Sequence, residues 1–387
     1  MVKQLLFIPG PVTCAGEVLD AMSRPLVDHR GPEFAELLAT IGSGMQPIFG
    51  TANEIVVLGC SGTGGLEAAI ASSFSPGQKV LGCPTGVFGQ RLASIATTYG
   101  LEVELLETPL GARVDAEALA ARLRADREHA LAGVLLTHNE TSTGVQNDMA
   151  ALARAIGDHP ATVVVDSVSG LGASAFEMDA WNFDVVVTAS QKALGVPPGL
   201  ALVAVSPRGW ERIAKAEAPR FYLDLKRART FAAQGQTPWT PPVSLAYALE
   251  VGIRRYHAEG AAHVFARHER YANAIRAFAA GAALEIFSRP DAHSVTVVAM
   301  RVPAGLEAAA IRRELRETHG VVIGGGQAEL KGKILRMGTM GHISPTDLLR
   351  GLEAFESTLR LQGHPIAERA GVHAARAFLD EQLATTR

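Results

Sequence analysis

Short apolar runs alternate with helical patterns between residues 54 and 205, and this alternation limits the possible folds more than any other feature of the chain. Short β-branched runs that are separated by helices are typical of a mainly parallel sheet covered by helices on both faces. Seven such runs are present, at residues 54–58, 79–83, 102–107, 131–137, 162–166, 183–188 and 200–205. The pattern therefore predicts an α/β domain with a mainly parallel seven-stranded sheet.

The pattern changes past residue 260, which predicts a second, smaller α+β domain. Helices are expected at 261–279, 306–319 and after Ser344, and strands at 284–287, 294–302, 321–323 and 333–337. At the other end, an apolar start runs into Pro9–Gly10–Pro11, which favours an extended arm. The predicted organisation is an N-terminal arm at 1–15, a large domain at 16–260 and a small C-terminal domain at 261–387.

Composition excludes several classes of protein. The chain has 387 residues and a net charge of −3 without a basic block, which argues against a nucleic-acid partner. No apolar run approaches the roughly 20 residues of a membrane span, and Met1 leads into no signal peptide. The three cysteines have neither disulfide nor zinc spacing, so no metal site is expected. We expect a cytoplasmic protein with neither a membrane nor a nucleic-acid partner.

Polar groups follow several of the predicted strands. In a parallel sheet the carboxyl ends of the strands share one edge, where ligands bind. Ser61–Thr63, Asn139–Thr143, Asp166 and Lys192 all fall at such ends. Lys192 follows a valine-rich run and passes at once into a Gly/Pro-rich turn. A lysine in such a setting is a candidate for a lowered pKa and for Schiff-base chemistry with a carbonyl.

These strand ends together supply what pyridoxal phosphate needs from a protein. Lys192 offers an amine for the aldehyde, and Asp166 offers an acid for the pyridinium nitrogen. The glycine-rich turn at 61–65, which leads into a helix, offers free amides for the phosphate. The sequence therefore predicts pyridoxal 5'-phosphate as the cofactor and Lys192 and Asp166 as catalytic residues.

Three segments strongly resemble the fold-type I aminotransferases of class V. They are Ser190–Gln191–Lys192–Ala193–Leu194 with its following Pro-Pro-Gly, Val165–Asp166–Ser167–Val168–Ser169–Gly170, and Ser61–Gly62–Thr63–Gly64. Within that class the chain is most similar to the alanine/serine–glyoxylate or pyruvate aminotransferases, from Pro9 to about Gly363. The resemblance implies a fold-type I homodimer with shared active sites, which moves the amino group of a small amino acid to a small 2-oxo acid.

The resemblance also assigns roles to individual residues. It places Ser61, Gly62, Thr63 and Gln191 at the phosphate, Phe88 and Val168 on the two faces of the cofactor ring, Thr141 at its phenolic oxygen, Thr240 at the partner subunit's phosphate, and Gly10 and Arg336 at the substrate. Arg336 suits the substrate carboxylate because a planar guanidinium binds it through two parallel hydrogen bonds.

Competing interpretations differ in how much they explain. A cysteine desulfurase needs a nucleophilic cysteine near the small domain, but all three cysteines lie before residue 84. An NAD-dependent oxidoreductase would leave Lys192 and Asp166 without a role. A class V aminotransferase with ureidoglycine, aspartate or aminoethylphosphonate as donor stays open, and so does a non-catalytic subunit with the same fold. The segment Asp28–Gly31 receives no function from the sequence.

Overall fold

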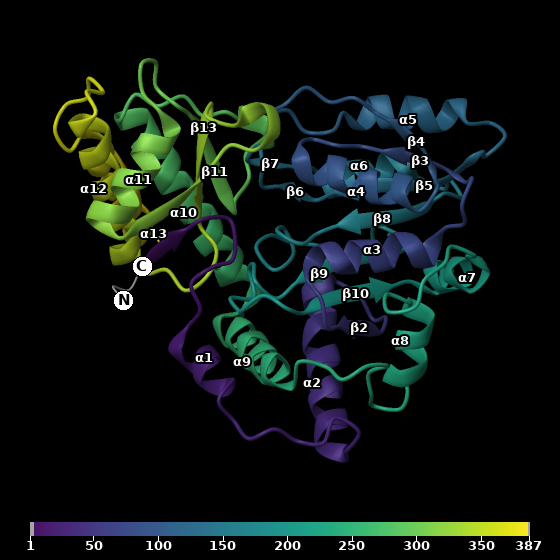
Figure 1. Ribbon diagram of the computed structural model, residues 1–387. Helices are drawn as coiled ribbons and strands as arrows, with labels where there is room; N and C mark the ends of the chain where they lie inside the picture. The colour runs from purple at the N-terminus through teal and green to yellow at the C-terminus, as the bar shows by residue number, and fades with distance from the viewer. Residues whose placement is uncertain (1–3, 386–387) are drawn as a thin grey trace.

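The large sheet confirms the predicted α/β architecture (Figure 1). The computed structural model describes residues 4–385, so the first three residues of the predicted arm and the last two of the predicted small domain lie outside the described residues. The sheet has seven strands in the order β2-β10-β9-β8-β5-β3-β4, and β10 alone among them runs antiparallel to its neighbours. The strands are β2 (Ile55–Leu58), β3 (Lys79–Gly82), β4 (Glu102–Leu105), β5 (Leu131–Thr137), β8 (Thr162–Asp166), β9 (Val185–Ala189) and β10 (Ala201–Val205).

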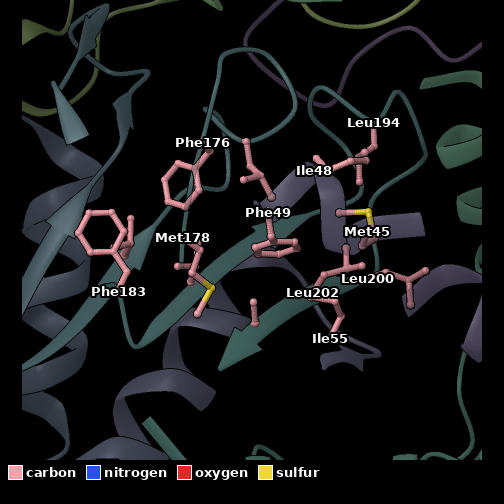
Figure 2. Packing of buried hydrophobic residues seen from close by; sticks show 14 of the residues in the cluster. Met45, Ile48, Phe49, Ile55, Phe176, Met178, Phe183, Leu194, Leu200 and Leu202 are labelled. Carbon is pink, nitrogen blue, oxygen red and sulfur yellow. The ribbon is translucent and has the colours of Figure 1, made fainter. Parts of the chain in front are cut away.

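Both faces of this sheet are buried, which explains why its strands are continuous apolar runs. In β8, Val163 and Val165 pack into one core cluster, whereas Val164 packs into the cluster on the opposite face. The covering helices are α2 (Pro32–Phe49), α3 (Gly62–Ser73), α4 (Val87–Thr98), α5 (Ala116–Ala125), α6 (Met149–Ile156), α7 (Pro207–Lys215), α8 (Leu225–Ala232) and α9 (Val243–Glu259). Figure 2 shows Leu194 in the first cluster near Met45 and Ile48, so the loop after β9 is anchored in the core.

A second, four-stranded sheet forms the smaller part of the molecule, at the left of Figure 1. Its strands lie in the order β1-β12-β13-β11. The elements here are β1 (Leu5–Phe7), β11 (Val297–Arg301), β12 (Val321–Gly325), β13 (Ile334–Gly338), α10 (Ala261–Gly281), α11 (Ala308–His319), α12 (Pro345–Leu361) and α13 (Ala370–Thr385). Ser344 caps α12 in a complete capping box with Asp347.

The predicted strand at 284–287 is wrong. Ile286 makes one isolated bridge with Met300, and no regular strand forms at this position. Chain geometry on both sides explains the failure, because Ala283 has a positive φ of 53° and a 3-10 turn begins at Pro290. The pairing with β11 therefore ends after a few residues.

The N-terminal segment joins the two parts of the molecule. Leu5–Phe7 pairs in parallel with β12, and the chain then crosses β13, where a side chain at Gly338 would come within 2.7 Å of the Ile8 oxygen. This path brings the Pro-Gly-Pro turn to the carboxyl edge of the large sheet. The proposed division into arm, large domain and small domain stays a prediction.

The remaining elements are short. They are α1 (Gly16–Ala21) and the hairpin of β6 (Asn139–Glu140) with β7 (Val145–Gln146). Within residues 4–385, none of the helices combines the length and apolar character that crossing a bilayer requires.

Candidate active site

Lys192 lies just past the end of β9, beside the N-terminal turn. Its Nζ donates a hydrogen bond to the main-chain oxygen of Pro9, and a Cβ added to Gly10 would come within 2.6 Å of Nζ. Burial lowers the pKa of Lys192 to about 8, an effect that the nearby Asp166 opposes and that Arg336 and Arg91 reinforce. Lys192 has no ion-pair partner among residues 4–385, and its lowered pKa makes the neutral, nucleophilic amine more abundant at neutral pH than in an ordinary lysine.

Asp166 ends β8, the strand next to β9 in the sheet. Its Oδ1 accepts a hydrogen bond of 2.9 Å from the main-chain nitrogen of Val168, and no hydrogen bond to Oδ2 occurs in the described part of the chain. Burial, helped by the negative charge of Glu140, raises the pKa of Asp166 to about 7, against the effects of the Val168 hydrogen bond and of Lys192. A carboxylate in this state would gain stability from a cationic partner.

The start of α3 lies where the phosphate cradle is predicted. Ser61 is the N-cap, and its hydroxyl accepts from the main-chain nitrogen of Gly64 at 3.5 Å. Gly62 packs against the predicted floor residue, because an added Cβ would lie 2.9 Å from a methyl carbon of Val168. Ser61 and Thr63 are both exposed. The helix therefore presents free amides and hydroxyl groups next to the ends of β8 and β9.

Gln191 adds an unmatched polar group to the same edge. Its Oε1 is buried and has no hydrogen-bond partner within the described residues. A buried side-chain amide without a partner is destabilising unless a ligand satisfies it. Its position directly before Lys192 agrees with the predicted role at the phosphate.

Phe88 lies in the first turn of α4, and Arg91 follows in the second. The guanidinium carbon of Arg91 lies 4.8 Å from the centroid of the Phe88 ring. Arg91 also donates to the hydroxyl of Thr63 at 3.4 Å, which places α4 beside the cradle. Phe88 is partly buried, and its contact with the cofactor ring stays a prediction.

Arg336 lies on β13 and is 5% exposed. Its Nε donates to the Gly325 oxygen at 2.8 Å and its Nη1 to the main-chain oxygen of Thr141 at 2.7 Å. Burial lowers the pKa of Arg336 to about 10, against the effect of Glu140. No carboxylate within residues 4–385 forms an ion pair with this guanidinium, so a substrate carboxylate can bind to it.

Within residues 4–385, the side chains of Thr141 and Thr240, two of the predicted site residues, make no hydrogen bond to Lys192 or Asp166 that would indicate their predicted roles. Thr141 contacts Arg336 through its main chain, and its hydroxyl makes no hydrogen bond to any described residue. Thr240 is exposed and lies between α8 and α9, beside Gly59. The structure of one chain does not bring Thr240 to Lys192, and a contact with a partner's cofactor stays a prediction.

The sequence interpretation missed three groups. These are the Pro9 carbonyl, the Arg91 guanidinium and the Glu140 carboxylate. Glu140 lies inside a recognised motif, and it is the one acid in the hydroxyl-rich run Thr141–Thr143 and its flanks. That contrast was a usable signal, because an acid within a buried loop needs several donors. The other two groups gave no signal of this kind.

The residues present fit pyridoxal phosphate. A partly buried amine, a buried acid with a raised pKa, an unmatched amide and a helix N-terminus all converge on one edge of the sheet. Cys60 lies next to Ser61, but burial raises the pKa of its thiol to about 12, which makes it a poor nucleophile. The geometry therefore favours carbonyl–amine chemistry over thiol chemistry.

Comparisons with known proteins point to the same chemistry. The family described as aminotransferase class V matches residues 20–343. An L-aspartate–glyoxylate aminotransferase from Paracoccus denitrificans is 38% identical over 96% of this chain and 95% of its own length. A serine–glyoxylate aminotransferase from Arabidopsis thaliana is 31% identical, over 98% of this chain and 96% of its own. The crystal structure of pyridoxamine–pyruvate aminotransferase from Mesorhizobium loti superposes with a TM-score of 0.93 at 30% identity, and 98% of each chain is covered.

Proposed function

Because this chain belongs to the class V aminotransferases and is a pyridoxal-phosphate-dependent transaminase, we propose that it moves the amino group of alanine or serine to glyoxylate or pyruvate. The observation that carries the proposal is the buried Arg336, which has no ion-pair partner within the described chain and stands near Lys192. All three of the relatives described above are named for a small 2-oxo acid, glyoxylate or pyruvate. The donors in their names differ.

Bound pyridoxal phosphate supplies an aldehyde that takes up the amino group and a ring that accepts the electron pair of the Cα–H bond. Lys192 holds the cofactor until substrate arrives and then moves one proton from Cα as general base and acid. Asp166 keeps the pyridine nitrogen protonated, because its charged carboxylate favours the cationic ring. Arg336 binds the α-carboxylate and so fixes the direction of the Cα–H bond relative to Lys192.

A small donor agrees with the charges around Arg336. Arg312, whose positive charge helps to lower the pKa of Arg336, lies exposed on α11, and its Nε donates to the Ile323 oxygen at 3.1 Å. Among the described residues, no second arginine beside Arg336 is both buried and free for a side-chain carboxylate. A donor with an uncharged side chain therefore leaves fewer buried charges unmatched.

Aspartate is the second candidate donor, and one observation favours it. Arg91 stands next to the cradle and has no ion-pair partner in the part of the chain that the structure describes. It could bind a second carboxylate. A panel of alanine, serine and aspartate against glyoxylate and pyruvate distinguishes the donors. Faster turnover of aspartate, abolished in Arg91→Gln, would overturn the small-donor proposal.

We further propose a homodimer in which Thr240 contacts the partner's cofactor phosphate. Support comes from an exposed aromatic group around this segment, where Phe221 is 66% and Tyr222 is 50% exposed. Both rings lie within 6 Å of Trp239, at 4.9 and 5.9 Å between centroids. Exposed aromatic clusters of this kind are typical of interfaces. Thr240→Val mixed with Lys192→Ala should regain activity that neither variant has fully alone.

The predicted cytoplasmic location also stays a proposal. Its support is chemical, because Cys14, Cys60 and Cys83 are all free thiols. Fractionation of the source cells would test it.

A further inference from the structure

The N-terminus of α4 carries Phe88, but it has no cap of its own. Gly86 occupies the N-cap position and offers no side chain, and the first main-chain N–H that bonds back within the helix is that of Gln90, to the Gly86 oxygen at 3.0 Å. The N–H groups of Val87, Phe88 and Gly89 therefore need acceptors from elsewhere.

Two residues of a different segment provide these acceptors. The Val87 nitrogen donates to the Ser142 hydroxyl at 2.9 Å. The nitrogens of Phe88 and Gly89 both donate to Oε2 of Glu140, each at 3.0 Å. The Ser142 hydroxyl in turn donates to Oε1 of Glu140 at 2.5 Å. Every free N–H of the first turn is thus satisfied from one buried loop.

Burial raises the pKa of Glu140, and its hydrogen bonds, all of which suit a carboxylate, oppose that shift. Its side chain is 0% exposed, and each of its hydrogen bonds in the described chain comes from a donor, which includes the Ser142 nitrogen at 3.1 Å. A carboxamide would turn an NH2 group toward these donors, and a methyl group would leave them unsatisfied. The site also lies at a helix N-terminus, where negative charge is favoured.

The same loop also reaches the predicted substrate clamp. The main-chain oxygen of Thr141, which follows Glu140, accepts from Arg336. The loop packs closely against the start of α4, because a Cβ at Gly86 would lie 2.4 Å from the Ser142 hydroxyl and 2.7 Å from Cγ of Glu140. A change at Glu140 is therefore transmitted both to Phe88 and to Arg336.

We propose that Glu140 is a positioning residue of the active site, which holds α4 so that the Phe88 ring covers the cofactor ring and which supports the loop behind Arg336. It touches neither cofactor nor substrate and acts through these two side chains. The inference rests on the proposed places of Phe88 and Arg336 in the site. It assigns a function to a buried charge that the reaction itself does not use.

The test measures cofactor binding and the visible circular dichroism of the bound cofactor in Glu140→Gln. Loss of charge-assisted hydrogen bonds at the first turn should raise the Kd for pyridoxal phosphate by about ten- to a hundredfold. The visible dichroism should weaken, because the ring is no longer held at one angle against Phe88. In a Phe88→Ala background the same substitution should have little further effect on Kd, since coupled residues are not additive.

Asp126→Asn is the matched control. Asp126 is also a buried carboxylate, 8% exposed, that accepts from two main-chain nitrogens, those of Ala130 and Leu131, and its Oδ2 lies 3.3 Å from Nε2 of His159. It precedes the start of β5, whereas the site residues lie at the carboxyl ends of the strands. Asp126→Asn should lower the melting temperature of the apoprotein without changing Kd or the dichroism. Glu140→Gln should change all three.

Several outcomes separate this inference from the proposed function. If the wild-type protein fails to bind pyridoxal phosphate, the proposed function falls. If the wild type binds it and Glu140→Gln keeps the wild-type Kd and dichroism, or if its effect adds fully to that of Phe88→Ala, the positioning role is overturned. If Glu140→Gln does not fold, Ser142→Ala serves instead, because it removes the Val87 acceptor and one donor to Glu140 but keeps the carboxylate. It should shift Kd and dichroism in the same direction by a smaller amount, and unchanged values would overturn the inference.

Discussion

Two polar regions meet at the carboxyl edge of the large sheet, and they differ in how fully their hydrogen bonds are satisfied. The first, formed by Asp166, Gln191, Lys192 and Arg336, keeps unmatched atoms or charges within the described chain. The second, the loop Asn139–Thr143, has partners for nearly all of its polar side chains. Unmatched buried groups are costly, so the first region is arranged for a ligand and the second for rigidity.

The satisfied loop also connects the two parts of the molecule. The Nδ2 of Asn139 donates to the hydroxyls of Ser169 and Thr296, at 2.9 Å each, and its Oδ1 accepts from Ser294 at 2.6 Å. Ser169 follows β8 of the large sheet, whereas Ser294 and Thr296 precede β11 of the four-stranded sheet. Changes in the first region should therefore affect chemistry, and changes in the second should affect folding or geometry.

The largest expected effect is at Lys192. Lys192→Ala removes the cofactor attachment and the proton-transferring base together, so turnover should fall at least about a thousandfold. The melting temperature of the apoprotein should stay close to that of the wild type, because the amine has one hydrogen bond and no ion pair in the described chain. Turnover within tenfold of the wild type would remove Lys192 from the chemistry.

Arg336→Lys comes next. Leaving a desolvated carboxylate without its partner costs about 3–5 kcal/mol, and an ammonium recovers only part of that, so kcat/KM should fall about a hundredfold or more. The Kd for the cofactor should change little. The control substrate is an amine without a carboxylate, and an equal loss for that amine would mean that Arg336 supports the fold.

Asn139→Ala tests the second region, the loop Asn139–Thr143. Three buried hydroxyls, those of Ser169, Ser294 and Thr296, each lose a partner, so the free energy of unfolding should fall by about 2–3 kcal/mol in denaturant titrations. Turnover per folded molecule should change far less than in the lysine or arginine variants. A large loss of turnover with unchanged stability would contradict the contrast between the two regions.

The smallest effect is a pH dependence. Attack on the cofactor aldehyde requires neutral Lys192, whose pKa is lowered to about 8, so the rate of cofactor uptake by apoprotein should rise with pH and level off above about pH 8. Between pH 7 and pH 9 the neutral fraction increases about tenfold. Stopped-flow absorbance would follow the uptake. A rise that continues past pH 10 would indicate an unperturbed lysine.

Local sequence indicated the first region, that of Asp166 and Lys192, more fully than the contacts of the second, the loop Asn139–Thr143. The valine run of β8 marks a strand buried on both faces, and its end at Asp166 follows directly. The partners of the site are not local, because Pro9 is 183 residues from Lys192 and Glu140 is 52 residues from Phe88. Spacing carries no information on such contacts. Strand 284–287 failed for a related reason, since its length depends on how neighbouring turns direct the chain.

The most direct test of the account is borohydride reduction of the holoprotein followed by peptide mapping. The purified protein should be yellow, and reduction should fix one pyridoxyl group per chain on the peptide that contains Lys192. The pyridoxal phosphate that is bound before reduction should be lost in Lys192→Ala and kept in Arg336→Lys. A label on any other lysine, or a protein that takes up no pyridoxal phosphate, would contradict the assignment of this sheet edge as the active site.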